Sequence, residues 1–254
     1  MSDCLIVEHR HGVLVMTINR PEVRNALDGA TGRALAAALD ELDGSDDVGA
    51  GVLTGAGGNF SAGMDLKAFL TGDVPDVPGR GLGGLTRRPP RKPLLAAVEG
   101  WAVAGGFELV LACDLVVAGA SAKFGVPEVK RSLVAGAGAA LRLPRRLPHA
   151  LAMELLLTGE PVTAARAYEM GLVNRVVDDA DACAAAVEIA LAIAGNGPLA
   201  LAATKQIALN CRDWTSDVEW ERQHSIMDPV FASDDAREGA RAFAEKRAPV
   251  WRGR

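Results

Sequence analysis

Short apolar runs alternate with amphipathic segments through the first half of the chain. The segment over residues 31–42 places Leu35, Leu39 and Leu42 on one helical face, and Gly44 follows as a helix-ending signal. The apolar runs have the length of strands. We therefore predict strands over residues 5–8, 13–18, 51–55, 94–98 and 114–118, and helices over residues 31–42, 64–70 and 105–112. Strands and helices that alternate at this spacing predict an α/β fold with parallel strand pairing.

After residue 125 the pattern becomes mainly helical. The predicted helices cover residues 138–143, 149–157, 164–170, 180–194, 199–210, 216–227 and 234–246. We expect a core of residues 1–196, followed by a helical C-terminal subdomain of residues 197–254. The segment 72–93 is rich in Pro, Gly and Arg and has no apolar period, so we expect a mobile surface loop there.

The stretch from residue 94 to 112 holds the first candidate chemistry. An apolar strand leads into a turn of small residues, and the helix predicted after it carries Glu108 in its first turn. Gly105 and Gly106 let the backbone approach a ligand and present unpaired N–H groups to it. A helix N-terminus favours negative charge, so the turn suits an oxyanion or a phosphate. By itself, this stretch is equally well interpreted as a tight turn whose acid only complements the helix dipole.

Composition and charge exclude several classes of protein. The chain has 254 residues, 49% of them hydrophobic, which is enough for one large α/β core. The net charge of -5 argues against nucleic-acid binding. The four cysteines are widely spaced, without a CxxC pair or a His cluster, so we expect free thiols and no metal site. We find neither a secretory signal nor an apolar run long enough to span a membrane, and expect a cytoplasmic protein.

Three loops that each follow an apolar strand carry the remaining candidate groups. They are residues 61–66, 104–108 and 124–128. Because the ends of parallel strands gather at one edge of a sheet, these loops can meet at one crevice. There the backbone N–H groups near Met64 and Gly105 would stabilise a developing oxyanion. Glu108 and Glu128 would form an acid pair suited to adding or removing water.

Six motifs in order along the chain make a resemblance specific. They are Asn19-Arg20-Pro21 with Asn25-Ala26-Leu27, Ser61-Ala62-Gly63-Met64-Asp65-Leu66, Gly105-Gly106-Phe107-Glu108-Leu109, Phe124-Gly125-Val126-Pro127-Glu128, Leu157-Thr158-Gly159-Glu160, and Gly171-Leu172-Val173-Asn174-Arg175-Val176-Val177. Together they resemble the enoyl-CoA hydratase/isomerase (crotonase) family, from about residue 13 to residue 251. The resemblance implies a spiral of ββα units with a C-terminal helical trimerisation subdomain. It also implies an acyl-CoA thioester as substrate, no further cofactor, and a homotrimer or dimer of trimers.

The resemblance assigns roles residue by residue. The N–H groups of Met64 and Gly105 match the two donors to the thioester oxygen, Glu108 matches the acid that activates water, and Glu128 matches the proton donor to the α-carbon. The reaction implied is reversible syn hydration of a trans-2-enoyl-CoA to a 3-hydroxyacyl-CoA. Positions matching the coenzyme A contacts of the family are Val23, Arg24, Ala62, Asp65, Leu66, Phe243 and Lys246. The basic run over residues 87–92 is interpreted either as a phosphate contact or as a solvated surface.

Departures from the hydratase pattern keep alternatives open. Met64 stands where a small residue is common, and its side chain would narrow the acyl pocket. Segments 127–131 and 141–144 look closer to the carnitinyl-CoA dehydratase-like branch of the family. Another crotonase-type reaction, such as that dehydration or an enoyl-CoA isomerisation, is therefore an alternative. A non-catalytic acyl-CoA-binding protein is a further one, although such a protein would be expected to lose one of the two acids.

Overall fold

The central feature of the fold is a six-stranded sheet in the order β1-β2-β3-β6-β8-β11. The computed structural model describes residues 4–254. Only β1 and β2 pair in antiparallel fashion, and the other four pairings of the sheet are parallel. The strands are β1 (Leu5–Arg10), β2 (Val13–Ile18), β3 (Ala50–Gly55), β6 (Leu94–Val98), β8 (Leu115–Gly119) and β11 (Arg175–Val177). This is the mixed α/β, mainly parallel arrangement that the alternating pattern predicts.

Helices cover both faces of this sheet, which explains why its strands are continuous apolar runs. On one face Val13, Val15 and Val52 pack against Ala186 and Ala190 of α7 (Ala182–Ala194). On the other face a larger core includes the leucines of α1 and the hydrophobic residues of α3 from Phe107 to Ala112. The helices before α7 are α1 (Gly29–Gly44), α2 (Leu66–Leu70), α3 (Gly105–Ala112), α4 (Ala139–Arg146), α5 (His149–Thr158) and α6 (Ala164–Glu169).

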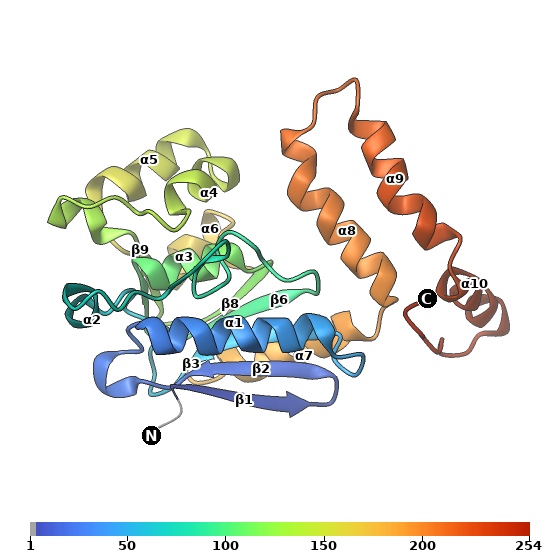
Figure 1. The fold of residues 1–254 in the computed structure, drawn as a ribbon, viewed down its shortest axis with the longest axis horizontal. Helices are drawn as coiled ribbons and strands as arrows, with labels where there is room; N and C mark the ends of the chain where they lie inside the picture. Colours follow the sequence, from blue (N-terminus) through green and yellow to red (C-terminus); the bar gives the residue numbers. More distant parts are fainter. Residues whose placement is uncertain (1–3) are drawn as a thin grey trace.

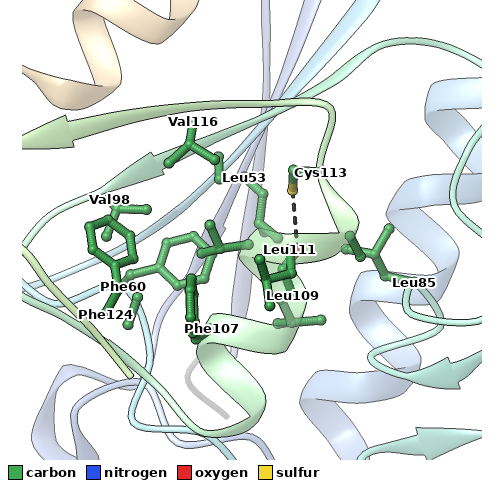
Figure 2. Packing of buried hydrophobic residues seen from close by; sticks show 14 of the residues in the cluster. Leu53, Phe60, Leu85, Val98, Phe107, Leu109, Leu111, Cys113, Val116 and Phe124 are labelled. Carbon is green, nitrogen blue, oxygen red and sulfur yellow. Dashed lines mark hydrogen bonds between the residues drawn. The ribbon is translucent and has the colours of Figure 1, made fainter. Parts of the chain in front are cut away.

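Helix α3 lies inside the larger core, so its first turn is rigidly held. All eight of its residues are buried. Figure 2 shows Phe107 beside Phe124, whose ring centroids lie 5.6 Å apart, with Leu109 and Leu111 packed further along the helix. Phe124 belongs to a second, three-stranded sheet in the order β10-β9-β7, formed by β7 (Trp101–Val103), β9 (Lys123–Gly125) and β10 (Val162–Thr163). The packing of Phe107 fixes the position of Glu108, the next residue.

Two sequence-based expectations need correction. The turn after residue 98 contains β7, which pairs in parallel with β9, so the helix does not follow the apolar strand directly. The segment 72–93 is not purely loop, because β4 (Asp76–Val77) and β5 (Gly81–Leu82) form a hairpin and the side chains of Leu82 and Leu85 are buried. Both pairings involve only two or three residues, which is too short to leave a periodic signal in the sequence.

The last three helices lie apart from the sheet. Figure 1 shows α8 (Pro198–Asn210) and α9 (Glu219–Phe231) as a hairpin that projects from the core, with α10 (Asp234–Glu245) beyond it. The expected boundary at residue 196 falls in the turn between α7 and α8. Within residues 4–254 no single helix is long and apolar enough to span a membrane, although α7 with the segment Pro198–Asp213, sharply bent, meets that test by length and composition alone.

Candidate active site

A buried asparagine holds the loop that carries Met64. Asn25 has φ 55° and no exposed surface, and its amide donates to the backbone oxygens of Ala56 at 2.8 Å and Asn59 at 2.7 Å. Its own backbone oxygen accepts a hydrogen bond from the Ser61 hydroxyl at 2.7 Å. These contacts fix both ends of the glycine-rich turn before Met64. The Asn-Ala-Leu motif therefore has a structural role here that sequence reasoning did not assign.

A strained residue brings the start of α3 beside this loop. Ala104 has φ 51° and ψ -130°, a conformation that side chains rarely adopt, and its N–H donates to the oxygen of Gly125 at 2.9 Å. A Cβ atom added to Gly63 would lie 2.9 Å from the nitrogen of Gly105. One added to Gly105 would lie 3.6 Å from the nitrogen of Met64. The backbones of Met64 and Gly105 thus lie side by side.

Both of these backbone donors are available to a ligand. Among the hydrogen bonds of residues 4–254, none has the N–H of Met64 or of Gly105 as its donor. The Gly105 N–H is at the N-terminus of α3, where the helix dipole favours negative charge. An oxygen that gains charge would receive two hydrogen bonds and the field of a helix at this position.

Glu108 is held by the N-terminus of α4. The residue is 3% exposed, and Oε1 of its carboxylate accepts a hydrogen bond from the backbone N–H of Ala139 at 3.0 Å. Burial raises the pKa of Glu108, while the backbone at Ala139, Ala137 and Gly138 and the charge of Arg142 act to lower it. The opposing effects suit a carboxylate that exchanges a proton during a reaction.

Glu128 is the less satisfied of the two acids. It lies in a short 3-10 helix, Pro127–Arg131, and its Oε2 is buried without a hydrogen-bond partner among the described residues. Burial, followed by the nearby charge of Glu108, raises the pKa of Glu128 to about 6. Two carboxyl groups that share one site hold their protons jointly, so the raised pKa values belong to the pair.

One cavity of about 950 Å³ joins these groups. Met64, Gly105, Glu108 and Glu128 all line it. Much of the remaining wall is apolar and comes from the segment from α2 to β5 and from α4 with the residues before it. It includes Leu66, Phe69, Val74, Leu82, Leu133 and Leu141. The structure therefore brings the four predicted catalytic positions together in one place. Their chemical roles stay predictions.

The residues expected to hold coenzyme A divide into two groups. Ala62 and Leu66 line the cavity, whereas Val23, Arg24, Asp65, Phe243 and Lys246 do not. Asp65 has a structural role, because its carboxylate caps α2 and pairs with Arg20 at 3.1 Å. The oxygen of Arg24 accepts a hydrogen bond from Ala62 at 2.9 Å, so its backbone supports the loop. Phe243 is 87% exposed on α10, in the part of the chain that projects from the core.

The fold places the two ends of the basic run at residues 87–92 in different surroundings. Arg87 lines the cavity. The backbone N–H groups of Arg91 and Lys92 instead donate to the carboxylate of Asp43 at 2.9 and 3.0 Å. Only the first residue of the run is thus placed to meet a ligand in the cavity.

Sequence reasoning missed Arg142, which also lines the cavity. It lies on α4, four residues after Gly138, in a segment that stood out in the sequence only by its helical period and its likeness to the carnitinyl-CoA dehydratase-like branch. Its hydrogen bonds go to backbone oxygens, and no sequence motif predicts such bonds.

The fold and site together define an α/β protein with a cavity that holds two free N–H donors and a pair of acids. Such a site can polarise a carbonyl oxygen and move protons at the neighbouring carbons.

Comparisons with known proteins agree with that class. The family model described as enoyl-CoA hydratase/isomerase matches residues 8–254. Enoyl-CoA hydratase EchA19 of Mycobacterium tuberculosis is 46% identical, over 98% of this chain and 96% of that protein. Carnitinyl-CoA dehydratase of Salmonella typhi is 39% identical over the full length of both chains. A crystal structure of an enoyl-CoA hydratase from Mycobacterium tuberculosis superposes with a TM-score of 0.98, at 53% identity over all of both chains. The chain belongs to the enoyl-CoA hydratase/isomerase family and has the crotonase fold.

Proposed function

We propose that the protein is an enoyl-CoA hydratase that adds water reversibly, with syn geometry, to trans-2-enoyl-CoA thioesters. The observation that carries the proposal is the presence of both Glu108 and Glu128 in one cavity with two free backbone donors. By the family resemblance, isomerases, dehalogenases and decarboxylases differ from the hydratases in their acids, so both glutamates together favour a hydratase or a dehydratase. A protein that only bound acyl-CoA would be expected to lose one of the two acids. The similarity to enoyl-CoA hydratases over the whole chain supports the same reaction.

The mechanism follows from the different states of the two acids. The Glu108 carboxylate takes a proton from water as the water oxygen bonds to C3 of the enoyl group. The electron pair of the double bond moves towards the thioester oxygen, where the N–H groups of Met64 and Gly105 stabilise the charge. Glu128, whose pKa of about 6 allows it to carry a proton, then gives that proton to C2. Proton exchange between the acids restores the starting state.

The substrate brings coenzyme A with it, so the reaction needs no further cofactor. Ala62 and Leu66, on the cavity wall, are proposed to lie along the pantetheine and thioester. Arg87, also on the wall, is proposed as a phosphate contact because its guanidinium has no ion-pair partner among residues 4–254. For Val23, Arg24, Asp65, Phe243 and Lys246 a contact with coenzyme A remains a proposal from the family resemblance alone.

Carnitinyl-CoA dehydration is the second candidate, because relatives with that name match the full chain. Its substrate class carries a quaternary ammonium group, which proteins hold with aromatic rings and negative charge. This cavity has one aromatic side chain, Phe69, and four arginines, Arg87, Arg131, Arg142 and Arg145, against three acids, two of which are the proposed catalytic pair. The charge balance favours an apolar acyl group over a cationic one.

The first test is an assay of the purified protein with crotonyl-CoA and longer 2-enoyl-CoA thioesters. Hydration removes the absorbance of the enoyl thioester, and we expect a loss that depends on enzyme concentration. A thioester whose acyl chain ends in a trimethylammonium group should be turned over more slowly than an apolar thioester of similar length. Absence of turnover across the chain-length panel would exclude the hydratase proposal, and a preference for the cationic thioester would favour the dehydratase alternative.

The role of Glu128 has its own test in the variant Glu128→Gln. The amide keeps the size of the side chain but cannot give a proton to C2, so we expect kcat to fall by roughly 100-fold or more. Binding of a saturated acyl-CoA, measured by calorimetry, should stay within about threefold of wild type. Equal losses of binding and catalysis would show that Glu128 is structural.

We also propose that copies of this chain assemble as a trimer or a dimer of trimers. The support is that α8 and α9 bury none of their residues within one chain, although both carry apolar side chains.

A reducing, cytoplasmic compartment is proposed as well. Its support is that Cys4, Cys113, Cys183 and Cys211 are all free thiols.

A further inference from the structure

We propose that Arg142 is a positioning residue for Glu108, acting through the turn at residues 137–139 that holds the Glu108 carboxylate. This inference rests on the proposed hydratase function, because it assigns how one of the two acids is kept in place. Arg142 lines the cavity but need not touch the substrate for this role. The contacts that carry the proposal all lie within one wall of the site.

The first step is the cradle around Glu108. The Ala139 N–H donates to Oε1 of Glu108 at 3.0 Å, at the point where α4 begins. The residue before it, Gly138, has φ 117°, which turns the chain so that its N–H groups face the carboxylate. The position of Glu108 therefore depends on where this turn lies relative to α3.

The second step is how Arg142 holds that turn. From one turn further along α4, its guanidinium reaches back and donates through Nη1 to the oxygen of Ala137 at 3.4 Å and through Nη2 to the oxygen of Thr86. Thr86 is 4% exposed, and its hydroxyl accepts a hydrogen bond from the Leu82 N–H at 3.0 Å. One side chain thus ties the turn before α4 to the buried segment that follows β5.

Gly138 leaves the space that the guanidinium needs. A Cβ atom on Gly138 would overlap Nη1 of Arg142, so a side chain at 138 and this arrangement of Arg142 exclude each other. Arg142 also makes no ion pair within residues 4–254, and both of its hydrogen-bonded partners are backbone oxygens. A half-buried guanidinium that donates its hydrogen bonds to two backbone carbonyls is consistent with a positioning role rather than with a surface charge.

The charges around Glu108 allow us to predict how the removal of Arg142 changes the pH dependence of kcat. Glu128 faces it across the cavity, and Arg142 is the cation that acts on it from α4. The other arginines of α4 are engaged elsewhere: Arg145 pairs with Asp213 at 3.3 Å, and Arg146 donates to the oxygen of Cys113 at 3.2 Å. Of the remaining cations on the cavity wall, Arg131 acts on Glu128, and Arg87 lies on the segment after β5. Because the Arg142 charge favours ionised Glu108, its removal should raise the pKa of that carboxyl.

The test compares Arg142→Gln with Arg145→Gln, which removes the same charge from the same helix and the same cavity wall, but breaks an exposed pair with Asp213 and no contact with the turn at residues 137–139. In Arg142→Gln we expect kcat for crotonyl-CoA to fall about tenfold or more, because Glu108 is misplaced. We also expect the acid limb of the kcat profile to move by about half a pH unit to higher pH, since Glu108 must be ionised to act as base. KM should change less than threefold. Arg145→Gln should keep the acid limb of wild type.

Arg142→Lys separates the contacts from the charge. Because the variant keeps the charge, the acid limb of its kcat profile should return part of the way to its wild-type position. Its kcat should stay low, because an ammonium cannot reach both carbonyls as a guanidinium does. Melting temperature and binding of a saturated acyl-CoA show whether each variant is folded. An unshifted acid limb in folded Arg142→Gln, or equal shifts in the two glutamine variants, would overturn the inference. A wild-type protein without hydratase activity would instead overturn the proposed function.

Discussion

At the scale of single residues, the position of Glu128 is unfavourable for stability, as expected of a residue that has the proposed catalytic role. Its Oε2 is buried without a partner, and its pKa is raised to about 6 by burial and by the charge of Glu108. Above pH 6 the folded protein must hold this carboxylate ionised, which is less favourable than in the unfolded chain. Between pH 4.5 and 6 the folded state binds the proton more readily, so this group makes stability fall as pH rises through that range.

We therefore expect Glu128→Gln to melt at a higher temperature than wild type at pH 7. The pKa shift, discounted for the partial exposure of the side chain, corresponds to roughly 1 kcal/mol, which is about 2–4 °C for a chain of this size. The difference should shrink towards zero at pH 4.5, where the carboxyl is protonated. Calorimetry at fixed protein concentration measures it, with Glu160→Gln, an exposed glutamate, as control. A variant that melts lower than wild type at pH 7 would contradict this account.

At the scale of elements, the site depends on how closely the loop before Met64 approaches the start of α3. Gly63 has φ 89°, and a Cβ atom there would lie 2.9 Å from Ala104 Cβ and 3.0 Å from the oxygen of Val103. The N–H groups of Met64 and Gly105 can lie side by side only because Gly63 and Ala104, which meet at this contact, have no side chain larger than a methyl group. The strain at Ala104 belongs to the same contact, since it directs α3 towards the loop.

Gly63→Ala should therefore separate the two donors. We expect kcat to fall roughly 100-fold, the effect of losing one oxyanion donor, as measured with crotonyl-CoA. Gly58→Ala is a matched control, because Gly58 also has a positive φ of 77° but a Cβ atom there would meet nothing within 4 Å. Gly58→Ala should lose about 1–2 kcal/mol of stability from the left-handed backbone. Gly63→Ala should lose more, because its Cβ atom also clashes with Ala104 and Val103. Equal activity in the two variants would show that the close approach does not matter.

The elements also show what sequence can predict. The apolar runs of β2, β3 and β6 and the helix from Gly105 to Ala112 follow from periodicity, because each is buried in a regular environment. The strands β7, β9 and β10 do not, because two or three residues pair with partners distant in the sequence. In the site, convergence of the loops at strand ends is predictable from parallel pairing. The contacts of Asn25 and Arg142 with backbone oxygens are not, since only the folded chain brings those oxygens within reach.

At the scale of the whole molecule, the helical hairpin of α8 and α9 is little covered by the rest of residues 4–254, because none of the residues of either helix is buried. One strong contact joins α8 to the core: Lys205 donates to Asp114 at 2.6 Å and to the oxygen of Lys92 at 2.8 Å. This ion pair fixes where the hairpin leaves the sheet, but it covers none of the apolar surface beyond. Trp220 is 64% exposed and Phe231 73% exposed on α9. Large exposed side chains gathered on one element are typical of an interface.

We expect light scattering on the purified protein to give the mass of a trimer or a hexamer. The double variant Trp220→Asp with Phe231→Asp places two charges on the exposed surface of α9, where burial in an interface would be strongly unfavourable. It should shift the mass towards that of a monomer at micromolar concentration. Ile6→Asp, on the edge strand β1 and 40% exposed, introduces one such charge away from these helices and should leave the mass unchanged. A monomeric wild-type protein would show that α8 and α9 remain uncovered, and a double variant with unchanged mass would place the interface elsewhere.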